Sequence, residues 1–498
     1  MKYDLLHDQL VETDAGLFSL PGLLAAMAAG RVSRFPALRP HQRPAWHMFL
    51  VQLGVMALDR AGLAVIPQDE AAWRAALRLL TRDFADDAPW HLVVDTPAQP
   101  GFMQPPDPGG LKWTEVATPD TLDMVITSRN HDLKTAVAQH AAPQDWIFAL
   151  VSLQTMEGYG GAGNAGVARM NGGSSSRAML ALAPALQGGR VVDPSAWFRR
   201  DVSRLLATRA GPERPALLWC LPWAEGRVLT LDQLDPLVIE ICRRVRLQDG
   251  LRALRATSSA ARIDAKALKG MTGDPWAPIH IAETKALTLG ERDWTYKLIC
   301  ELYFGDAWAR PPLAEPGPDE GADDMLLIAE AFARGNSKTD GFKSRVIPVP
   351  KAVKKTMLGI KAVELARDQI ELITKVDIAL RNGLALISAE GERDKVGKAN
   401  YARTAPARDS LQARADALFF PALWDKLAAG SESGRLAVHA RLMRDMAAAA
   451  RAAFERAAPA IPCASIMRPR AETRGRAALN RGIAAIFKES DMTEVEHA

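Results

Sequence analysis

The most unusual segment of the sequence is a glycine-rich stretch at residues 158–173, which holds Gly158, Gly160 and Gly161 near its start. Glycine allows backbone angles with positive φ and lets another molecule approach the main chain closely. So many glycines together indicate a loop that contacts a ligand, such as a phosphate group or the edge of a nucleic-acid base. A flexible surface loop is the plainer interpretation of the same composition.

Gly158, Gly160 and Gly163 also match the G-x-G-x-x-G spacing of dinucleotide-binding loops. That fingerprint has to follow a strand and open a helix, with an acidic residue about 20 positions further on. Here the sequence predicts a helix before the loop, and more glycine and serine after it. A nucleotide- or cofactor-dependent enzyme that uses the loop at 158–166 is therefore the alternative function.

A second polar cluster lies at residues 128–134 and contains Arg129 and Asn130. Arginine and asparagine can read base edges, and arginine also binds phosphates. His131 and Asp132 could instead belong to a metal site, but no second cluster has matching ligand spacing, so we expect no metal. The plain alternative is a solvated start of a helix.

Basic residues are clustered although the net charge of the chain is only +4. Residues 343–355 contain five basic side chains and no acid, and residues 252–269 carry five basic side chains against one acid. Such runs are typical of surfaces that bind a phosphate backbone, although each alone could be a solvated face. The candidate phosphate-backbone residues are Lys343, Arg345, Lys351, Lys354 and Lys355.

Motifs for covalent or metal-assisted catalysis are missing from the sequence. There is no G-x-S-x-G, the nine histidines are scattered, and none of the four cysteines pairs in a C-x-x-C. We therefore expect a protein that is not an enzyme and that needs no cofactor. The sequence also begins without a signal-peptide pattern and has no apolar run of membrane-spanning length, so we expect a cytoplasmic protein without a membrane partner.

The elements that position these residues change in character near residue 350. Before it, helices are predicted at 44–62, 68–85 and 143–156, Ser19 is predicted to cap a helix, and a short strand is predicted at 238–242. After it, apolar residues recur at helical spacing. The fold class is α+β: a mixed α/β N-terminal domain at 1–350, then a C-terminal four-helix bundle at 351–498 with helices at 352–388, 408–429, 433–457 and 469–488.

An ordered series of motifs along nearly the whole chain resembles the CasA family, the large subunit of the type I-E CRISPR Cascade complex. The series begins with residues 17–21, 38–42 and 101–104, and continues with the glycine loop at 158–173. A Trp-Pro turn at 273–278 and the segment 331–336 follow. One departure is that this chain lacks the mid-chain cysteine set that binds zinc in some members.

The resemblance implies roles for particular residues. It places Gly158, Gly160 and Gly161 against the protospacer-adjacent motif (PAM) of the target, and it assigns Lys266, in preference to Lys269, to the PAM-contacting segment. Arg129 and Asn130 fall in the first DNA-contacting loop of the family. The wedge that begins strand separation is expected at Arg334, Gly335, Asn336 and Lys338, with Asn336 or a near neighbour in the place of a glutamine.

The family resemblance also implies the partners. These are double-stranded target DNA, CRISPR RNA, the other Cascade subunits, and a helicase-nuclease recruited in trans. The chain would recognise the PAM, start strand separation for R-loop formation and help to recruit the nuclease. Besides the enzyme alternative, a purely structural subunit of another assembly stays open.

Overall fold

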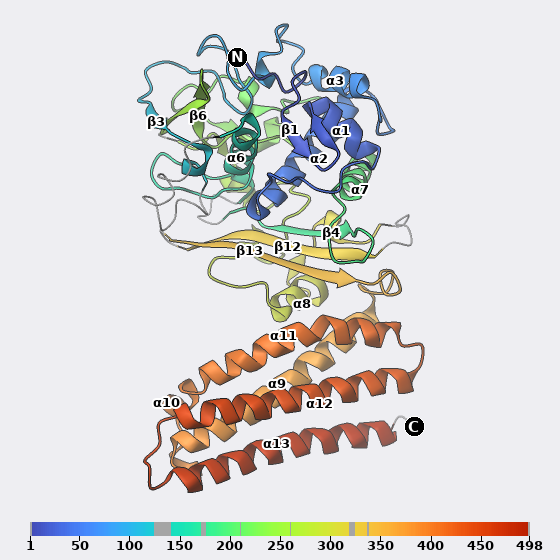
Figure 1. The fold of residues 1–498 in the computed structure, drawn as a ribbon, viewed down its shortest axis with the longest axis vertical. Helices are drawn as coiled ribbons and strands as arrows, with labels where there is room; N and C mark the ends of the chain where they lie inside the picture. Colours follow the sequence, from blue (N-terminus) through green and yellow to red (C-terminus); the bar gives the residue numbers. More distant parts are fainter. Residues whose placement is uncertain are drawn as a thin grey trace. The chain divides into compact units, whose positions relative to one another are not determined.

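The computed structural model describes residues 2–123, 141–170, 176–209, 211–258, 260–317, 324–335 and 338–496 of the 498-residue chain, without side chains at 170, 334–335, 338–340 and 490–496. The chain divides into two compact units (Figure 1). Unit 1 comprises Met1–Trp294 and Ala307–Pro348, and unit 2 comprises Thr295–Asp306 and Val349–Ala498.

Helix α2 forms the centre of the helical part of unit 1. It is buried from Pro44 to Leu58 and packs against α3, α6 and α7. Ser19 caps α1 as predicted, because its Oγ accepts a 3.1 Å hydrogen bond from the Gly22 N–H. The predicted helices are present, although α3 is shorter than expected. The helices are α1 (Leu20–Ala28), α2 (Arg43–Arg60), α3 (Glu70–Leu79), α6 (Pro143–Thr155) and α7 (Pro194–Ala207).

The strands of unit 1 form several small sheets. In one, β12 lies between β13 and β4 and pairs antiparallel with β4, from Met325 opposite Pro184 to Glu330 opposite Met179. In another, β7 lies between β3 and β6. These six strands are β3 (Thr114–Val116), β4 (Met179–Pro184), β6 (Arg244–Gln248), β7 (Arg252–Ala256), β12 (Met325–Gly335) and β13 (Lys338–Val349).

The remaining strands of unit 1 are two or three residues long. β1 pairs with β2, β5 with β8, and β9 lies between β10 and β11. Their bounds are Val11–Thr13 (β1), Gly16–Phe18 (β2), Leu229–Thr230 (β5), Ile263–Asp264 (β8), Ile279–His280 (β9), Lys285–Ala286 (β10) and Trp308–Ala309 (β11).

The strand predicted at 238–242 is wrong. This buried run makes a single bridge, between Ile239 and Leu217, and joins no sheet. Side-chain amides take the place of a neighbouring strand: Gln52 Nε2 donates to the Val238 carbonyl at 3.2 Å, and Gln154 Oε1 accepts from the Cys242 N–H at 2.9 Å. Apolar residues therefore predicted burial correctly, but the backbone of Ile239 bonds to that of Ala216 and Leu218, and distant glutamines bind the groups on either side.

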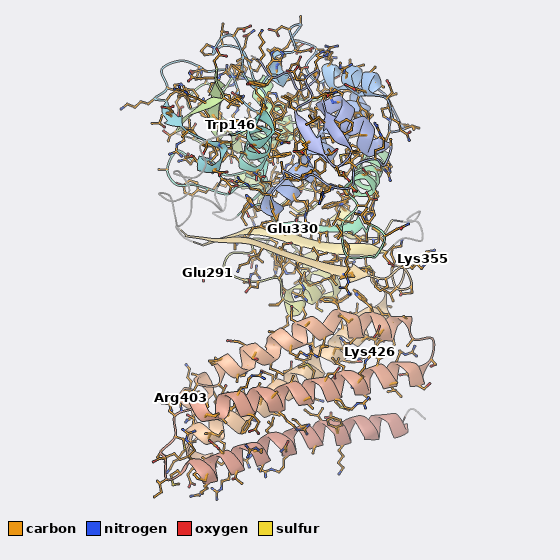
Figure 2. All side chains as sticks on the ribbon, in the orientation of Figure 1. Trp146, Glu291, Glu330, Lys355, Arg403 and Lys426 are labelled. Carbon is orange, nitrogen blue, oxygen red and sulfur yellow. The ribbon has the colours of Figure 1, made fainter. Side chains whose placement is uncertain are left out.

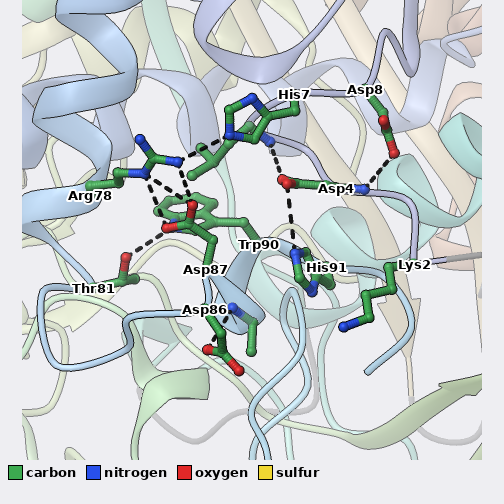
Figure 3. Close-up of polar contacts among 12 residues, drawn as sticks. Lys2, Asp4, His7, Asp8, Arg78, Thr81, Asp86, Asp87, Trp90 and His91 are labelled. Carbon is green, nitrogen blue, oxygen red and sulfur yellow. Dashed lines mark hydrogen bonds and ion pairs between the residues drawn. The ribbon is translucent and has the colours of Figure 1, made fainter. Parts of the chain in front are cut away.

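The first residues of the chain are fastened to α3 and to residues 86–91 by a polar network (Figure 3). Arg78 on α3 forms an ion pair with Asp87, at 2.6 Å between Nη2 and Oδ2, and its Nη2 lies 3.0 Å from His7 Nε2. Asp4 Oδ2 lies 3.6 Å from His91 Nε2. These contacts hold the N-terminal segment on the core of unit 1.

Unit 2 contains the four long helices that the sequence predicted. Helices α9 and α13 approach so closely that a Cβ on Gly475 would lie 2.7 Å from the Gly383 carbonyl oxygen, so glycine is required at that crossing. Residues 351–358 form turns, and α9 starts later than expected. The bounds are Ile360–Ser388 (α9), Lys398–Ala402 (α10), Ala405–Ala428 (α11), Glu432–Ala457 (α12) and Arg468–Glu496 (α13).

A fifth element of unit 2 comes from the middle of the sequence. Helix α8 (Tyr296–Phe304) packs on α9 and α11. The Tyr296 ring stacks on Phe419 with centroids 4.7 Å apart, and the Asp416 carboxylate accepts a 2.6 Å hydrogen bond from the Tyr296 N–H. A single cut of the chain near residue 350 therefore does not reproduce the two units.

Candidate functional site

The glycine-rich segment forms a closed loop directly after α6. The Gly160 N–H donates to the Asn164 carbonyl at 2.8 Å, and the Asn164 N–H donates to the Gly161 carbonyl at 2.9 Å. The Gly158 carbonyl accepts a 2.6 Å hydrogen bond from Nη2 of the buried Arg243. The three candidate glycines therefore lie on a loop with a defined backbone, where Gly160 is exposed, Gly161 half-buried and Gly158 buried.

Two other glycines of the loop are required by packing inside unit 1. Gly163 has a φ of +76°, and a Cβ there would lie 2.6 Å from Thr257 Cβ. A Cβ at Gly166 would lie 2.7 Å from the backbone nitrogen of Tyr159. These distances leave no room for a side chain. Part of the glycine content thus serves close contacts within the chain, and the part around 160–162 is left to face solvent.

The loop lacks the structural context of a dinucleotide-binding fingerprint. Helix α6 precedes it where the fingerprint needs a strand, and the three-residue 3-10 helix Ala168–Met170 follows it. The G-x-G-x-x-G spacing therefore comes from a different kind of loop.

A buried ion pair fixes the far end of the loop. Arg169 is 1% exposed, and its Nε lies 2.9 Å from Glu240 Oε1. Glu240 Oε2 also accepts a 2.6 Å hydrogen bond from the Ala168 N–H. Burial raises the pKa of Glu240, and the guanidinium of Arg169 opposes that rise. The loop end is thereby tied to the buried run that contains Glu240.

A second buried ion pair joins the loop region to the predicted Trp-Pro turn. Arg177 Nε and Nη2 donate to the two carboxylate oxygens of Asp274 at 2.6 and 2.8 Å, and the guanidinium lies 5.2 Å from the centroid of the Trp276 ring. Burial alone would raise the pKa of Asp274, but Arg177, together with Arg169 and a hydrogen bond from the Trp276 N–H, outweighs it and holds that pKa below its usual range. The Arg177 N–H in turn donates to the Met156 carbonyl at 3.0 Å.

The segment that carries Lys266 and Lys269 is held to the glycine loop on both sides. Before the lysines, the Ser258 N–H donates to the Gly163 carbonyl at 3.0 Å. After them, Arg169 Nη1 donates to the Thr272 carbonyl at 3.1 Å. Both lysines are exposed. The structure therefore brings together the two segments that the sequence singled out separately.

Sequence reasoning missed the charged residues that make this connection. The sequence alone does not distinguish a buried arginine from an exposed one. The acidic partners also lie far away along the chain, 97 positions in the case of Arg177 and Asp274. Glu240 in the middle of an apolar run was the one available signal, because a buried carboxylate needs a partner. The residues missed are Arg169, Arg177, Glu240, Arg243 and Asp274.

The predicted wedge lies where β12 ends and β13 begins. The backbones of Arg334, Gly335 and Lys338 belong to these two strands, and their side chains lie outside the described part. Asn336 also lies outside the described residues, as do Arg129 and Asn130. The proposed roles of these residues stay predictions.

The predicted phosphate-binding cluster does not form one exposed surface. Lys343 on β13 forms a 2.8 Å ion pair with Asp293, and Arg345 Nη1 donates to the Trp294 carbonyl at 2.6 Å. These two basic residues of unit 1 therefore hold the segment before α8. In unit 2, Lys354 is 4% exposed, whereas its neighbours Lys351 and Lys355 are exposed.

A row of three basic residues supports both β12 and the segment that precedes residue 124. Arg39 Nη1 lies 2.6 Å from Asp120 Oδ1, and His41 Nε2 lies 2.5 Å from Asp123 Oδ2. Arg43 forms an ion pair with Glu330 on β12, and Glu330, which is 0% exposed, also accepts a 2.7 Å hydrogen bond from Ser344 Oγ on β13. Residues 39–43 thus hold two parts of the chain in place. One is the segment before residue 124, which leads to the predicted DNA-contacting cluster at 128–134, and the other is β12, which leads to the predicted wedge.

The described residues contain neither a metal-binding cluster nor a membrane-spanning helix. No group of three or more histidine, cysteine, aspartate or glutamate side chains within the described ranges is arranged to hold a metal ion. Nor is any helix in that part of the chain long and apolar enough to cross a membrane.

The architecture is that of an α+β protein with a helical bundle as its second unit, which confirms the predicted fold class. No protein-family model matches the sequence, and no curated protein matches it. The similarity appears when the folds of solved structures are compared.

Three solved structures match nearly the whole chain. They are CRISPR-associated protein Cse1 from Acidimicrobium ferrooxidans (TM-score 0.64, 18% identity, covering 98% of this chain and 99% of that one), CasA (Cse1) from Thermus thermophilus (0.65, 16%, 97% and 99%) and Cse1 from Thermobifida fusca (0.63, 15%, 97% and 98%). At these identities the likeness establishes the fold. The resemblance to CasA that the motifs predicted is therefore confirmed for the fold of the chain.

Proposed function

We propose that the chain is the large subunit of a type I-E-like CRISPR RNA-guided surveillance complex (Cascade) and that it recognises the PAM in double-stranded target DNA. The observation that carries the proposal is the attachment of the segment with Lys266 and Lys269 to the glycine loop on both sides. The fold shared with Cse1 structures over nearly the whole chain supports it.

PAM reading uses the bare backbone of the loop together with a lysine. A loop whose exposed turn, residues 160–162, carries no side chain larger than the methyl group of Ala162 can enter close to a groove, and an exposed ammonium can bind base acceptors or phosphates there. The minor groove presents a degenerate pattern of acceptors, so several related PAM sequences are expected to be tolerated. Gly158, Gly160 and Gly161 form the loop part of this site, and Lys266 the basic part.

Strand separation starts at the predicted wedge, Arg334–Lys338. Opening a base-pair step costs on the order of 1–2 kcal/mol, and pairing of the guide RNA with the target strand nearly balances that cost. Sequence specificity beyond the PAM therefore comes from the guide. The role of this chain is to begin, next to the PAM, the replacement of DNA–DNA pairing by RNA–DNA pairing. Arg129 and Asn130 hold the duplex during this step.

In this proposal the chain is not an enzyme, and it needs neither a cofactor nor a metal. It works in the cytoplasm with CRISPR RNA and the other Cascade subunits. Lys351 and Lys355, which are exposed, contact the phosphate backbone. The cleaving helicase-nuclease is recruited in trans.

Two substitutions test the assignment of the PAM site. Lys266→Ala removes an exposed ammonium, and Ala162→Asp adds a carboxylate at the exposed turn of the loop without straining a glycine. Each should weaken binding of the assembled complex to a matched duplex by about tenfold or more, since a lost or repelled contact at a groove costs roughly 1–3 kcal/mol. Titration of labelled duplex DNA measures this.

The matched controls are Ala162→Ser and Lys285→Ala. Lys285 is exposed and already paired with Glu283 at 3.0 Å. Both controls should bind DNA as the wild type does, and all four variants should assemble. Normal DNA binding by Lys266→Ala and Ala162→Asp would show that the PAM-site assignment is wrong.

A further inference from the structure

The helical bundle of unit 2 has a cavity of about 440 Å³, open to solvent, that is lined by residues of α9, α11, α12 and α13. This volume is within the range of small-molecule sites in proteins. Four of its lining side chains, called the apolar wall below, are apolar and buried: Leu365, Leu372, Met443 and Ile486.

A lysine is buried at this cavity. Lys426 is 2% exposed and lies among the helices of the bundle (Figure 2). Its Nζ lies 3.1 Å from His439 Nδ1, and no carboxylate in the described part of the chain lies at ion-pair distance from it. An ammonium can only donate, so Nδ1 accepts and the ring proton of the neutral imidazole is on Nε2. Burial, and then Lys426, lower the pKa of His439 to about 4, which keeps the ring neutral.

The other cations at the cavity are already paired. Lys375 lies 3.0 Å from Glu371 and 2.8 Å from Glu489. Arg435 pairs with Glu432 at 2.5 Å, and Lys361 with Glu364 at 3.3 Å. Asp368 lines the cavity as an exposed side chain without an ion pair to any described residue. Lys426 is thus the cation whose charge is left without a direct partner.

We propose that this cavity binds a small organic monocarboxylate, with the carboxylate on Lys426 and the apolar body against the leucines and Met443. A buried ammonium without a carboxylate at ion-pair distance is unfavourable, and a ligand carboxylate that accepts from Lys426 Nζ reduces that cost. The apolar wall then excludes water from the rest of the ligand.

The surrounding charges favour one negative charge over two. Asp368, Glu371, Glu432 and Glu489 all line the cavity, and each repels an incoming anion. A dianionic phosphate meets twice the repulsion of a monocarboxylate and gains nothing from the apolar wall. We therefore expect inorganic phosphate to bind at least about tenfold more weakly than hexanoate.

Calorimetric titration of the full chain with hexanoate tests the proposal. The wild type should bind saturably, and Lys426→Met should bind at least about tenfold more weakly, because it keeps the volume and loses the charge. Lys488→Met is the matched control, since Lys488 is exposed on the same bundle and does not line the cavity. Equal binding by wild type and Lys426→Met, or no saturable binding by the wild type, overturns the proposal.

The pH dependence of wild-type binding gives a second test that needs no variant. Burial lowers the pKa of Lys426 to about 8, against an opposing effect of Asp368. The affinity for hexanoate should be constant from pH 6 to about 8 and fall by about tenfold per pH unit above, as the amine loses its proton. An affinity that is level or rising above pH 8, or phosphate binding as tight as that of hexanoate, contradicts the site. The site consists of bundle residues only, so its failure leaves the DNA-binding proposal untouched.

Discussion

At the scale of single residues, the Arg177–Asp274 ion pair holds the segment that leads into β4, after the glycine-rich stretch, on the turn at 273–278. Both side chains are 2% exposed or less. We predict that Asp274→Asn lowers the free energy of unfolding of unit 1 by about 3–5 kcal/mol, because it leaves a buried guanidinium without its counter-charge. Urea denaturation followed by tryptophan fluorescence measures the loss.

The exposed pair Lys285–Glu283 is the comparison for that experiment. Its side chains are 57% and 58% exposed. Glu283→Gln should cost less than about 1 kcal/mol, since solvent screens such a pair. If the two substitutions had equal effects, the ion pair at Asp274 would not be the anchor described here.

Single residues were predictable where the cause was local. Ser19 could be recognised as a helix cap because its partner is three residues away. The burial of Arg262 could not be recognised. It belongs to the basic run at 252–269, which predicted an exposed surface, but it is 2% exposed and its guanidinium lies 5.4 Å from the Trp223 ring centroid. Burial of an arginine depends on partners far along the chain.

At the scale of elements, Arg43 on α2 controls the middle of strand β12. We predict that Arg43→Met, which leaves the carboxylate of Glu330 buried without its counter-charge, speeds hydrogen exchange of the β12 and β13 amides by at least about tenfold. Exchange followed by mass spectrometry gives the rate for each peptide.

Arg74→Met provides the control for this measurement. Arg74 pairs with Glu70 at 2.5 Å within one turn of α3, where solvent has access. Exchange in β12 and β13 should be unchanged in this variant. Unchanged exchange of β12 in Arg43→Met would rule out the supporting role of the Arg43–Glu330 pair.

The long helices could be predicted as elements, and the irregular parts of unit 1 could not. The helices of the bundle repeat their apolar residues at a period that the sequence displays directly. The run at 238–242 has the composition of a strand, yet Gln52 and Gln154 bind its backbone instead of another strand. Composition predicts burial, but it does not identify the partner.

At the scale of the whole molecule, the division into units is only partly visible in the sequence. The change to helical periodicity near residue 350 marks the start of most of unit 2. Helix α8 belongs to that unit because Tyr296 packs on Phe419, and nothing near Tyr296 in the sequence indicates a partner 123 positions away. The ordered motifs, in contrast, predicted the CasA fold over nearly the whole chain.

DNA binding should depend on ionic strength through the exposed basic residues alone. With a net charge of only +4, the protein has no strong overall attraction for DNA, so individual phosphate contacts matter. We predict that Lys355→Gln makes the negative slope of log K against log salt shallower by about 1, whereas Lys354→Gln leaves the slope unchanged because Lys354 is buried. Equal changes of the slope in the two variants would contradict a backbone contact at Lys355.

The most direct test of the central claim is duplex DNA binding by the guide-RNA complex, assembled with and without this chain, on a matched target with a randomised PAM. We predict that tight binding and strand opening both require the chain and select a limited set of PAM sequences. If the chain does not join the complex, or if it joins and alters neither binding nor PAM selection, it is not the recognition subunit.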